Sequence, residues 1–122
     1  MAIHQAYQEI RYERPAIKVL HNEGVSASQF TQVLLGIEEE AVPYAIDTKD
    51  QRDGKKLAFE ASQSSRLGIG IGVGVNGMFL HFEKLEEGKP LFELPLDASE
   101  ESLRALGANA ARLTKKLPFK SL

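Results

Sequence analysis

Residues 67–75 place a glycine at every second position, and this pattern constrains the fold more than any other feature of the sequence. Side chains alternate between the two faces of a β-strand, so Ile69, Ile71 and Val73 share one face. Glycine weakens an isolated strand, because it offers no side chain for packing. Four glycines in register therefore predict that a helix or another backbone lies unusually close to their face. These four are Gly68, Gly70, Gly72 and Gly74.

An Asn-Gly dipeptide, Asn76-Gly77, follows this strand directly. Both central residues of a type I′ turn need positive φ, and Asn-Gly is a pair that meets this need. We therefore expect residues 78–82 to fold back antiparallel to the glycine strand. A short edge strand at 91–94 is expected after the turn at 88–90.

Two strand–helix units precede this hairpin. The apolar run at 16–20 predicts a strand, and a helix follows that Ser26 or Ser28 caps and Pro43 ends. Residues 44–46 and 55–63 then repeat the order of strand and helix. Apolar residues three and four apart give the first helix a buried stripe of Phe30, Val33, Leu34, Ile37 and Ala41.

A last helix starts near Asp97 or Ser99 and ends at Pro118. Its expected buried face comprises Leu103, Leu106, Ala110, Leu113 and Leu117. The order of elements predicts one α/β layered domain over residues 15–122, with a mixed, mostly parallel sheet flanked by helices. Residues 1–14 are polar and without a clean period, and we interpret them as an N-terminal extension.

The composition excludes several classes of function. The chain of 122 residues has no cysteine, which removes thiolate nucleophiles, disulfides and zinc–thiolate sites. Its 15 basic and 17 acidic residues give no polybasic surface for nucleic acid or an anionic membrane. The longest charge-free run, 67–80, is shorter than the roughly 20 apolar residues of a membrane span. Because residues 1–13 lack the apolar stretch of a signal peptide, we expect a cytoplasmic protein.

Gly72, Gly74 and Gly77 match the GxGxxG spacing of a dinucleotide-binding loop. Such a loop opens a helix, whose N-terminus then holds the pyrophosphate. In this sequence the glycines lie within a predicted strand that continues into a hairpin. We therefore interpret them as structural.

Glu38, Glu39 and Glu40 occupy the last turn of the first predicted helix, where the helix dipole disfavours anions. At about 100° per residue, Glu39 points away from the buried stripe and the other two flank it. One interpretation is a solvated acidic face. The other is an oxygen ligand for a hard cation, or an anionic patch for a partner.

His21 and Glu23 follow the first predicted strand, at the end of the sheet where open α/β folds usually bind ligands. Asp47, Asp50 and Asp53 are candidates for the same rim. One interpretation is a paired-carboxylate or His–Asp acid–base site. Loop polarity alone explains the same residues.

Three segments carry a resemblance when they are taken together. They read LLGIEEE at 34–40 followed by VPY at 42–44, ASQSS at 61–65, and GANAARL at 107–113 followed by LPF at 117–119. In order and spacing they resemble the small subunit of the diol/glycerol dehydratase reactivating factor. The similarity extends from about Pro15 to Phe119, and it implies the fold of the dehydratase medium subunit.

The resemblance implies a non-catalytic chain that binds a large ATPase subunit with an actin-like core. The complex would rescue an adenosylcobalamin-dependent dehydratase that holds damaged cofactor. In that family the small subunit competes with the enzyme's medium subunit, so that the damaged cobalamin leaves, and ATP hydrolysis on the large subunit governs binding and release. The resemblance implies no cobalamin on this chain itself, and it is compatible with association with a bacterial microcompartment.

By the same resemblance, Glu39 coordinates magnesium at the interface with the large subunit, and Glu38 and Glu40 contact that partner. Magnesium keeps several waters and rarely takes an all-protein cage, so one carboxylate from this chain is a reasonable contribution. Self-association in the absence of the large subunit is a further expectation. Two alternatives stay open: a medium-subunit-like component of the dehydratase itself, and a stand-alone domain that uses His21 and Asp47.

Overall fold

Five strands form one mixed sheet in the computed structural model, which describes residues 14–122. The strand order is β2-β1-β3-β4-β5. β1 (Ile17–Asn22) lies between β2 (Tyr44–Lys49) and β3 (Ile69–Gly74), parallel to both. β4 (Gly77–Phe82) and β5 (Phe92–Leu94) continue the sheet antiparallel. This arrangement confirms the predicted α/β class with a mixed sheet.

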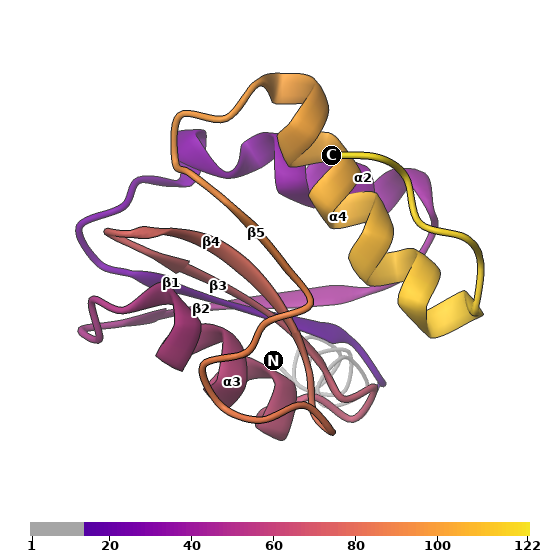
Figure 1. The fold of residues 1–122 in the computed structure, drawn as a ribbon, viewed down its shortest axis with the longest axis horizontal. Helices are drawn as coiled ribbons and strands as arrows, with labels where there is room; N and C mark the ends of the chain where they lie inside the picture. Colours follow the sequence, from indigo (N-terminus) through magenta and orange to yellow (C-terminus); the bar gives the residue numbers. More distant parts are fainter. Residues whose placement is uncertain (1–13) are drawn as a thin grey trace, which may run out of the picture.

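Helices cover both faces of the sheet (Figure 1). α2 (Thr31–Glu39), preceded by the 3-10 turn η1 (Ala27–Gln29), packs against α4 (Glu100–Lys115) on one face. α3 (Gly54–Ser64) covers the other face, across β1, β3 and β4. The result is a layered domain in which the sheet is the middle layer.

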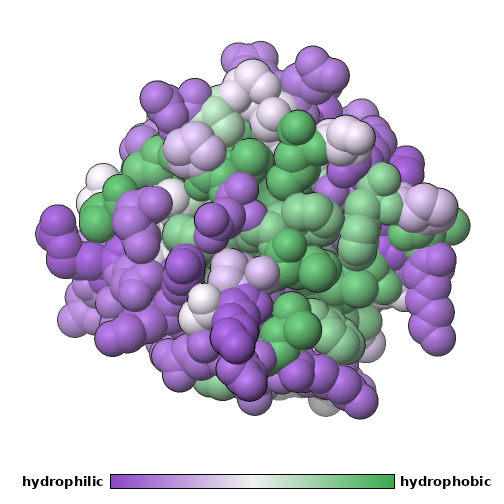
Figure 2. All heavy atoms as spheres, in the orientation of Figure 1, coloured by the Kyte–Doolittle hydropathy of each residue, from purple (hydrophilic) through white to green (hydrophobic). Residues whose placement is uncertain are grey.

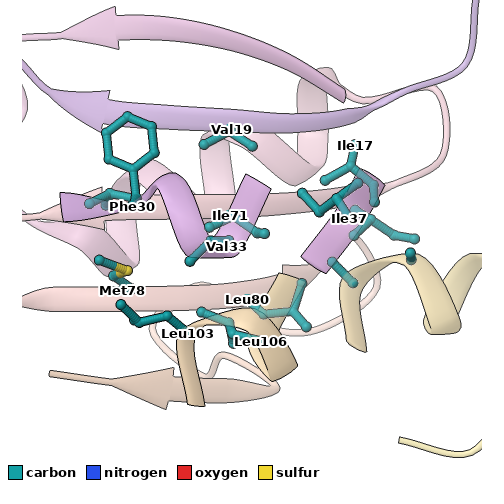
Figure 3. Close-up of a cluster of buried hydrophobic side chains, with 14 of the residues drawn as sticks. Ile17, Val19, Phe30, Val33, Ile37, Ile71, Met78, Leu80, Leu103 and Leu106 are labelled. Carbon is teal, nitrogen blue, oxygen red and sulfur yellow. The ribbon is translucent and has the colours of Figure 1, made fainter. Parts of the chain in front are cut away.

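The larger core lies between the sheet and the α2–α4 layer (Figure 3). Branched side chains from the central strands meet apolar side chains from both helices, and burying each one contributes about 1.5–3 kcal/mol. A smaller cluster of Leu20, Leu57 and Ala61 lies beneath α3. The labelled residues of the larger core are Ile17, Val19, Phe30, Val33, Ile37, Ile71, Met78, Leu80, Leu103 and Leu106.

The glycine face of β3 lies directly against α3, as the alternation predicted. A Cβ atom added to Gly70, Gly72 or Gly74 would lie 2.2 Å from a main-chain nitrogen of that helix. Such contacts essentially never occur below 3.0 Å, so any side chain there would displace the helix. Gly68 differs, because it precedes β3 with a φ of +73° and faces the Glu83 side chain. Three glycines, rather than four, therefore form the close contact.

The β3–β4 hairpin forms where it was expected, but its turn type differs from the prediction. Gly74 pairs with Gly77, so Val75 and Asn76 are the central residues. Neither has positive φ, whereas Gly77 has a φ of +136° as the first residue of β4. The Asn76 side chain instead accepts a hydrogen bond from the Gly54 N–H, at 2.8 Å. The type I′ assignment is therefore wrong, and Asn76 caps the start of α3.

The C-terminal ends of two helices also differ from the prediction. Ala41 lies beyond α2 with a φ of +60° and is exposed, so it does not continue the buried stripe. α4 ends at Lys115 because Lys116 adopts left-handed φ of +59°, and Pro118 is not what ends the helix. Leu117 consequently lies outside α4 and is 44% exposed.

Candidate functional site

The acidic run at the end of α2 carries the predicted metal ligand, Glu39, whose side chain is 58% exposed. This exposure agrees with the outward direction expected from the helix phase. Its Oε1 atom lies 3.5 Å from Nε of Arg104 on α4. Arg104 also donates hydrogen bonds to Oε1 of Gln32, one from Nε at 3.1 Å and one from Nη2. Sequence reasoning missed Arg104, because only the packing of α2 on α4 places it beside Glu39.

Glu40 has a different environment, although it is adjacent in sequence. Its carboxylate lies 3.3 Å from Nε of Arg112 and 3.6 Å from Nζ of Lys115, and its side chain is only 14% exposed. Both cations come from the last turn of α4, where positive charge is favoured by the helix dipole. Glu40 is thus held within the chain, where it joins the C-terminal ends of α2 and α4.

Glu38 faces the sheet edge. Its Oε1 atom accepts a hydrogen bond from the Tyr44 hydroxyl at 2.7 Å. This hydrogen bond, with smaller contributions from burial and the negative charge, raises the pKa of Tyr44 above its usual value of 10.0. The three adjacent carboxylates therefore have three separate sets of neighbours, and they do not form a uniformly solvated face.

Two glycines bring α2 and α4 close enough for these contacts. A Cβ atom on Gly36 would lie 2.0 Å from the Arg104 carbonyl oxygen, and one on Gly107 would lie 1.9 Å from the Val33 carbonyl oxygen. Both glycines belong to segments that carry the resemblance, LLGIEEE and GANAARL. The two segments therefore form one helix–helix contact that sets the position of Glu39.

The remainder of the third segment fixes the C-terminal tail. The buried side chain of Asn109 donates to the Lys120 carbonyl at 2.9 Å and accepts from the Lys120 N–H at 2.6 Å. Arg112 donates from Nη1 to the Pro118 carbonyl at 3.0 Å. The Phe119 ring meets the Phe92 ring edge-on, with centroids 5.1 Å apart. Residues 117–122 thus return over α4, which the sequence alone did not indicate.

An apolar band crosses the face that carries β5, α4 and this tail (Figure 2). Leu117, Phe119 and Leu122 are each at least 40% exposed. The half-buried Phe92 and Leu94 border the core on the same side. Contiguous apolar surface of this kind marks interaction sites on soluble domains.

The predicted His–Asp site does not form. His21 and Asp47 lie within β1 and β2, not in loops, and the pleat directs them to opposite faces of the sheet. The His21 ring contacts Thr48 Oγ1 at 3.0 Å through Nε2 and packs on Phe30, with ring centroids 4.8 Å apart. The His21 ring therefore makes contacts that stabilise the fold.

Among the remaining rim residues, the Asp53 side chain and the main chains of Glu23 and Asp50 make structural contacts. Asp53 caps α3 through a hydrogen bond from the Lys55 N–H at 2.9 Å. Glu23 donates its N–H to the Lys49 carbonyl at 2.9 Å, and the Asp50 carbonyl accepts from the Asn22 side chain at 3.2 Å. These contacts stabilise the ends of β1, β2 and α3.

Within residues 14–122, no group of three or more His, Asp or Glu side chains is arranged to hold a metal ion. The Glu39 carboxylate offers the oxygen ligand that magnesium prefers, with one oxygen near Arg104. A single exposed carboxylate of this kind could supply one oxygen ligand to magnesium, and the other ligands would then come from water or another chain. In the same residues, no helix is long and apolar enough to cross a membrane.

Comparison with known proteins extends over nearly the whole chain. The family model described as dehydratase medium subunit matches residues 14–120. The small subunit of the propanediol dehydratase-reactivating factor of Salmonella typhimurium is 38% identical over 96 residues, which cover 79% of this chain and 83% of the relative. The diol dehydratase-reactivating factor small subunit of Klebsiella michiganensis is 33% identical over 111 residues, covering 91% and 88%.

Two solved structures have the same fold. A chain of diol dehydratase-reactivating factor complexed with ADP and Mg²⁺ matches with a TM-score of 0.84 and 33% identity, over 89% of this chain and all of that one. A chain of glycerol dehydratase reactivase matches with a TM-score of 0.84 and 31% identity, over 88% and 98%. These findings confirm the resemblance carried by the three segments. The chain belongs to the dehydratase medium subunit family, among the small subunits of diol and glycerol dehydratase-reactivating factors.

Proposed function

We propose that this chain is the small, non-catalytic subunit of a reactivating factor for an adenosylcobalamin-dependent diol or glycerol dehydratase. The observation that carries the proposal is the similarity to reactivating-factor small subunits over most of both chains, in sequence and in fold. The large subunit hydrolyses ATP, and this chain competes with the dehydratase's medium subunit for its docking surface. Damaged cobalamin then leaves the enzyme. The complex acts in the cytoplasm, in association with a bacterial microcompartment.

Two features support a docking role. The family model is that of the dehydratase medium subunit, so a chain of this fold has the shape that displacement requires. The apolar band over β5, α4 and the tail offers surface for a protein partner (Figure 2). No step of this function needs a nucleophile or cofactor on this chain, because the free energy comes from ATP hydrolysis on the large subunit.

Glu39 is the residue that we propose holds magnesium at the interface with the large subunit, flanked there by Glu38 and Glu40. When bound, the ion supplies positive charge between oxygens of the two chains. Glu39 is exposed and projects its carboxylate from the end of α2, and Arg104 lies beside one of its oxygens. Glu38 and Glu40 position this helix end through Tyr44 and through the last turn of α4.

Co-expression with a large subunit of the family tests the proposal. We expect a stable complex that restores turnover to a diol or glycerol dehydratase inactivated by its substrate, with ATP, magnesium and intact adenosylcobalamin supplied. Each subunit alone should restore none. A pair that neither copurifies nor restores activity would refute the proposal.

A medium-subunit-like component of the dehydratase is the second candidate, because the matching family model carries that description. Cobalamin distinguishes the two, since a dehydratase component copurifies with the enzyme's large and small subunits as a coloured cobalamin complex. Under the leading proposal, this chain instead copurifies colourless with the ATPase.

A further inference from the structure

β2 forms one edge of the sheet and is exposed on both of its faces. α3 packs on β1, β3 and β4, and α2 packs on α4. Single contacts from these helices reach the two ends of β2, from Glu38 to Tyr44 and from Glu60 to Lys49. Every residue from Ala45 to Lys49 is exposed, including Ile46 at 43%. A depression of about 890 Å³ opens along the strand, and Lys18, Ala45 and Asp47 are among the residues that line it. An exposed edge with an apolar centre is a template for another strand.

The hydrogen bonds to β1 determine which main-chain groups of β2 face outward. The carbonyl oxygens of Pro43 and Lys49 accept the N–H groups of Ile17 and Glu23, at 3.0 and 2.9 Å. The N–H and C=O groups of one residue point to the same side of a strand, and successive residues alternate between the two sides. The odd-numbered residues of β2 therefore face β1, and the even-numbered ones face outward. The outward set is Tyr44, Ile46 and Thr48.

We propose that β2 pairs with β2 of a second copy of this chain, antiparallel and centred on Ile46. In this register Ile46 exchanges both of its outward hydrogen bonds with Ile46 of the second copy. Tyr44 exchanges its hydrogen bonds with Thr48 of the second copy, and the reverse pair forms by symmetry. A two-fold axis relates the two copies, so the contact forms a closed dimer and not a longer chain of copies. The two sheets become one continuous sheet.

Charges on β1 and β2 favour a second copy as the occupant. Lys18 is the register neighbour of Ala45, and in the proposed pairing Ala45 faces Asp47 of the second copy. Ala45 is small, so the long Lys18 side chain reaches across it to that carboxylate, and the ion pair forms twice. The same depression is also lined by Arg14, Arg66 and Glu38, so it carries both signs of charge. The surface is therefore complementary to itself.

The Asp47 carboxylate has a partner in the single chain, which the pairing replaces. Its Oδ1 atom accepts the outward N–H of Thr48 at 2.9 Å. In the dimer that N–H donates to the Tyr44 carbonyl of the second copy, and Asp47 becomes available to Lys18. No main-chain donor of β2 is left unsatisfied by the exchange.

Sedimentation equilibrium of the full chain, over about a hundredfold range of protein concentration, tests the dimer. Lys18→Asp and Asp47→Lys each place like charges together, and each should weaken self-association by at least about tenfold. Mixed in equal amounts, the two variants should dimerise again, because each introduced charge then faces its opposite. The exposed charges Lys84 and Asp97 provide the controls Lys84→Asp and Asp97→Lys, which should associate like the unaltered chain.

Several results would overturn the proposal. These are a full chain that stays monomeric throughout the range, a dimer that neither single variant weakens, and a mixture that does not recover. A chain that dimerises only after removal of residues 1–13 would mean that this segment, not a second copy, occupies the edge. None of these results depends on the large subunit, so the reactivating function is tested separately.

Discussion

Glu39 and Glu40 show how far two neighbouring residues of one type can differ. The exposed Glu39 shares a single contact of 3.5 Å with an arginine that is itself 45% exposed. Glu40 is largely buried between two cations. Exposed ion pairs contribute about 0–1 kcal/mol, so the Glu39 side chain is dispensable for folding and available to a partner.

Glu39→Gln should therefore separate association from stability. We expect the free energy of unfolding to change by less than about 1 kcal/mol, measured by urea denaturation. Magnesium-dependent association with the large subunit should fall, because the amide replaces the charged ligand. Glu87→Gln, on an exposed loop, is the matched control. Equal association of all three proteins, with and without magnesium, would remove Glu39 from the interface.

The close contact of β3 with α3 determines the spacing of two whole elements. Gly72→Ala would place a methyl group 2.2 Å from the Ala58 main-chain nitrogen, and a helix backbone cannot move aside as a side chain can. We expect a loss of about 3 kcal/mol or more in unfolding free energy. Gly24→Ala meets only a side-chain oxygen, at 3.0 Å, and should lose less than about 1 kcal/mol. Comparable losses for the two variants would contradict this interpretation.

The start of α3 gives a pH-dependent prediction. Burial raises the pKa of Asp53, but hydrogen bonds from Asn76 and from the Lys55 and Lys56 N–H groups outweigh it and leave that pKa below its usual value of 3.8. A lowered folded-state pKa contributes stability that is present above pH 3.8 and lost as the pH falls through the folded value. Asn76→Ala should raise the Asp53 pKa, measured by NMR titration. The unfolding free energy should then fall less steeply as the pH is lowered. An unchanged Asp53 titration would contradict the role of Asn76.

Among the helices and strands, the sequence indicated those features that depend on local patterns. Alternation located β3 and its close helix, and the three-and-four spacing located α2 and α4. The errors at Ala41 and Lys116 came from left-handed main-chain conformations. Such conformations are typical of glycine, and because neither residue is glycine, the residue type did not indicate them. The turn type at Asn76 was wrong because its side chain accepts a hydrogen bond from the first residue of α3, 22 positions earlier in the chain. Arg104 and Asn109 depend on contacts that only the tertiary fold creates.

The C-terminal tail closes one side of the fold. A chain that ends at Lys116 leaves the buried Asn109 amide without its two Lys120 partners and removes the Phe119 ring from Phe92. Each hydrogen bond contributes about 0.5–1.5 kcal/mol, and so does an edge-to-face ring pair, so we expect a loss of about 2–4 kcal/mol in unfolding free energy. Ending the chain at Ser121 retains both hydrogen bonds and should be nearly neutral. Similar stability for both truncations would show that the tail does not hold α4.

The contact between Asn109 and residue 120 uses only the main chain of the tail. Every amino acid except proline supplies the same N–H and C=O pair, so this contact does not depend on the side chain at position 120. The tail can therefore accumulate substitutions at position 120 while its path over α4 is retained. Asn109 cannot vary in the same way, because the full requirement for matching donor and acceptor lies on its side of the contact.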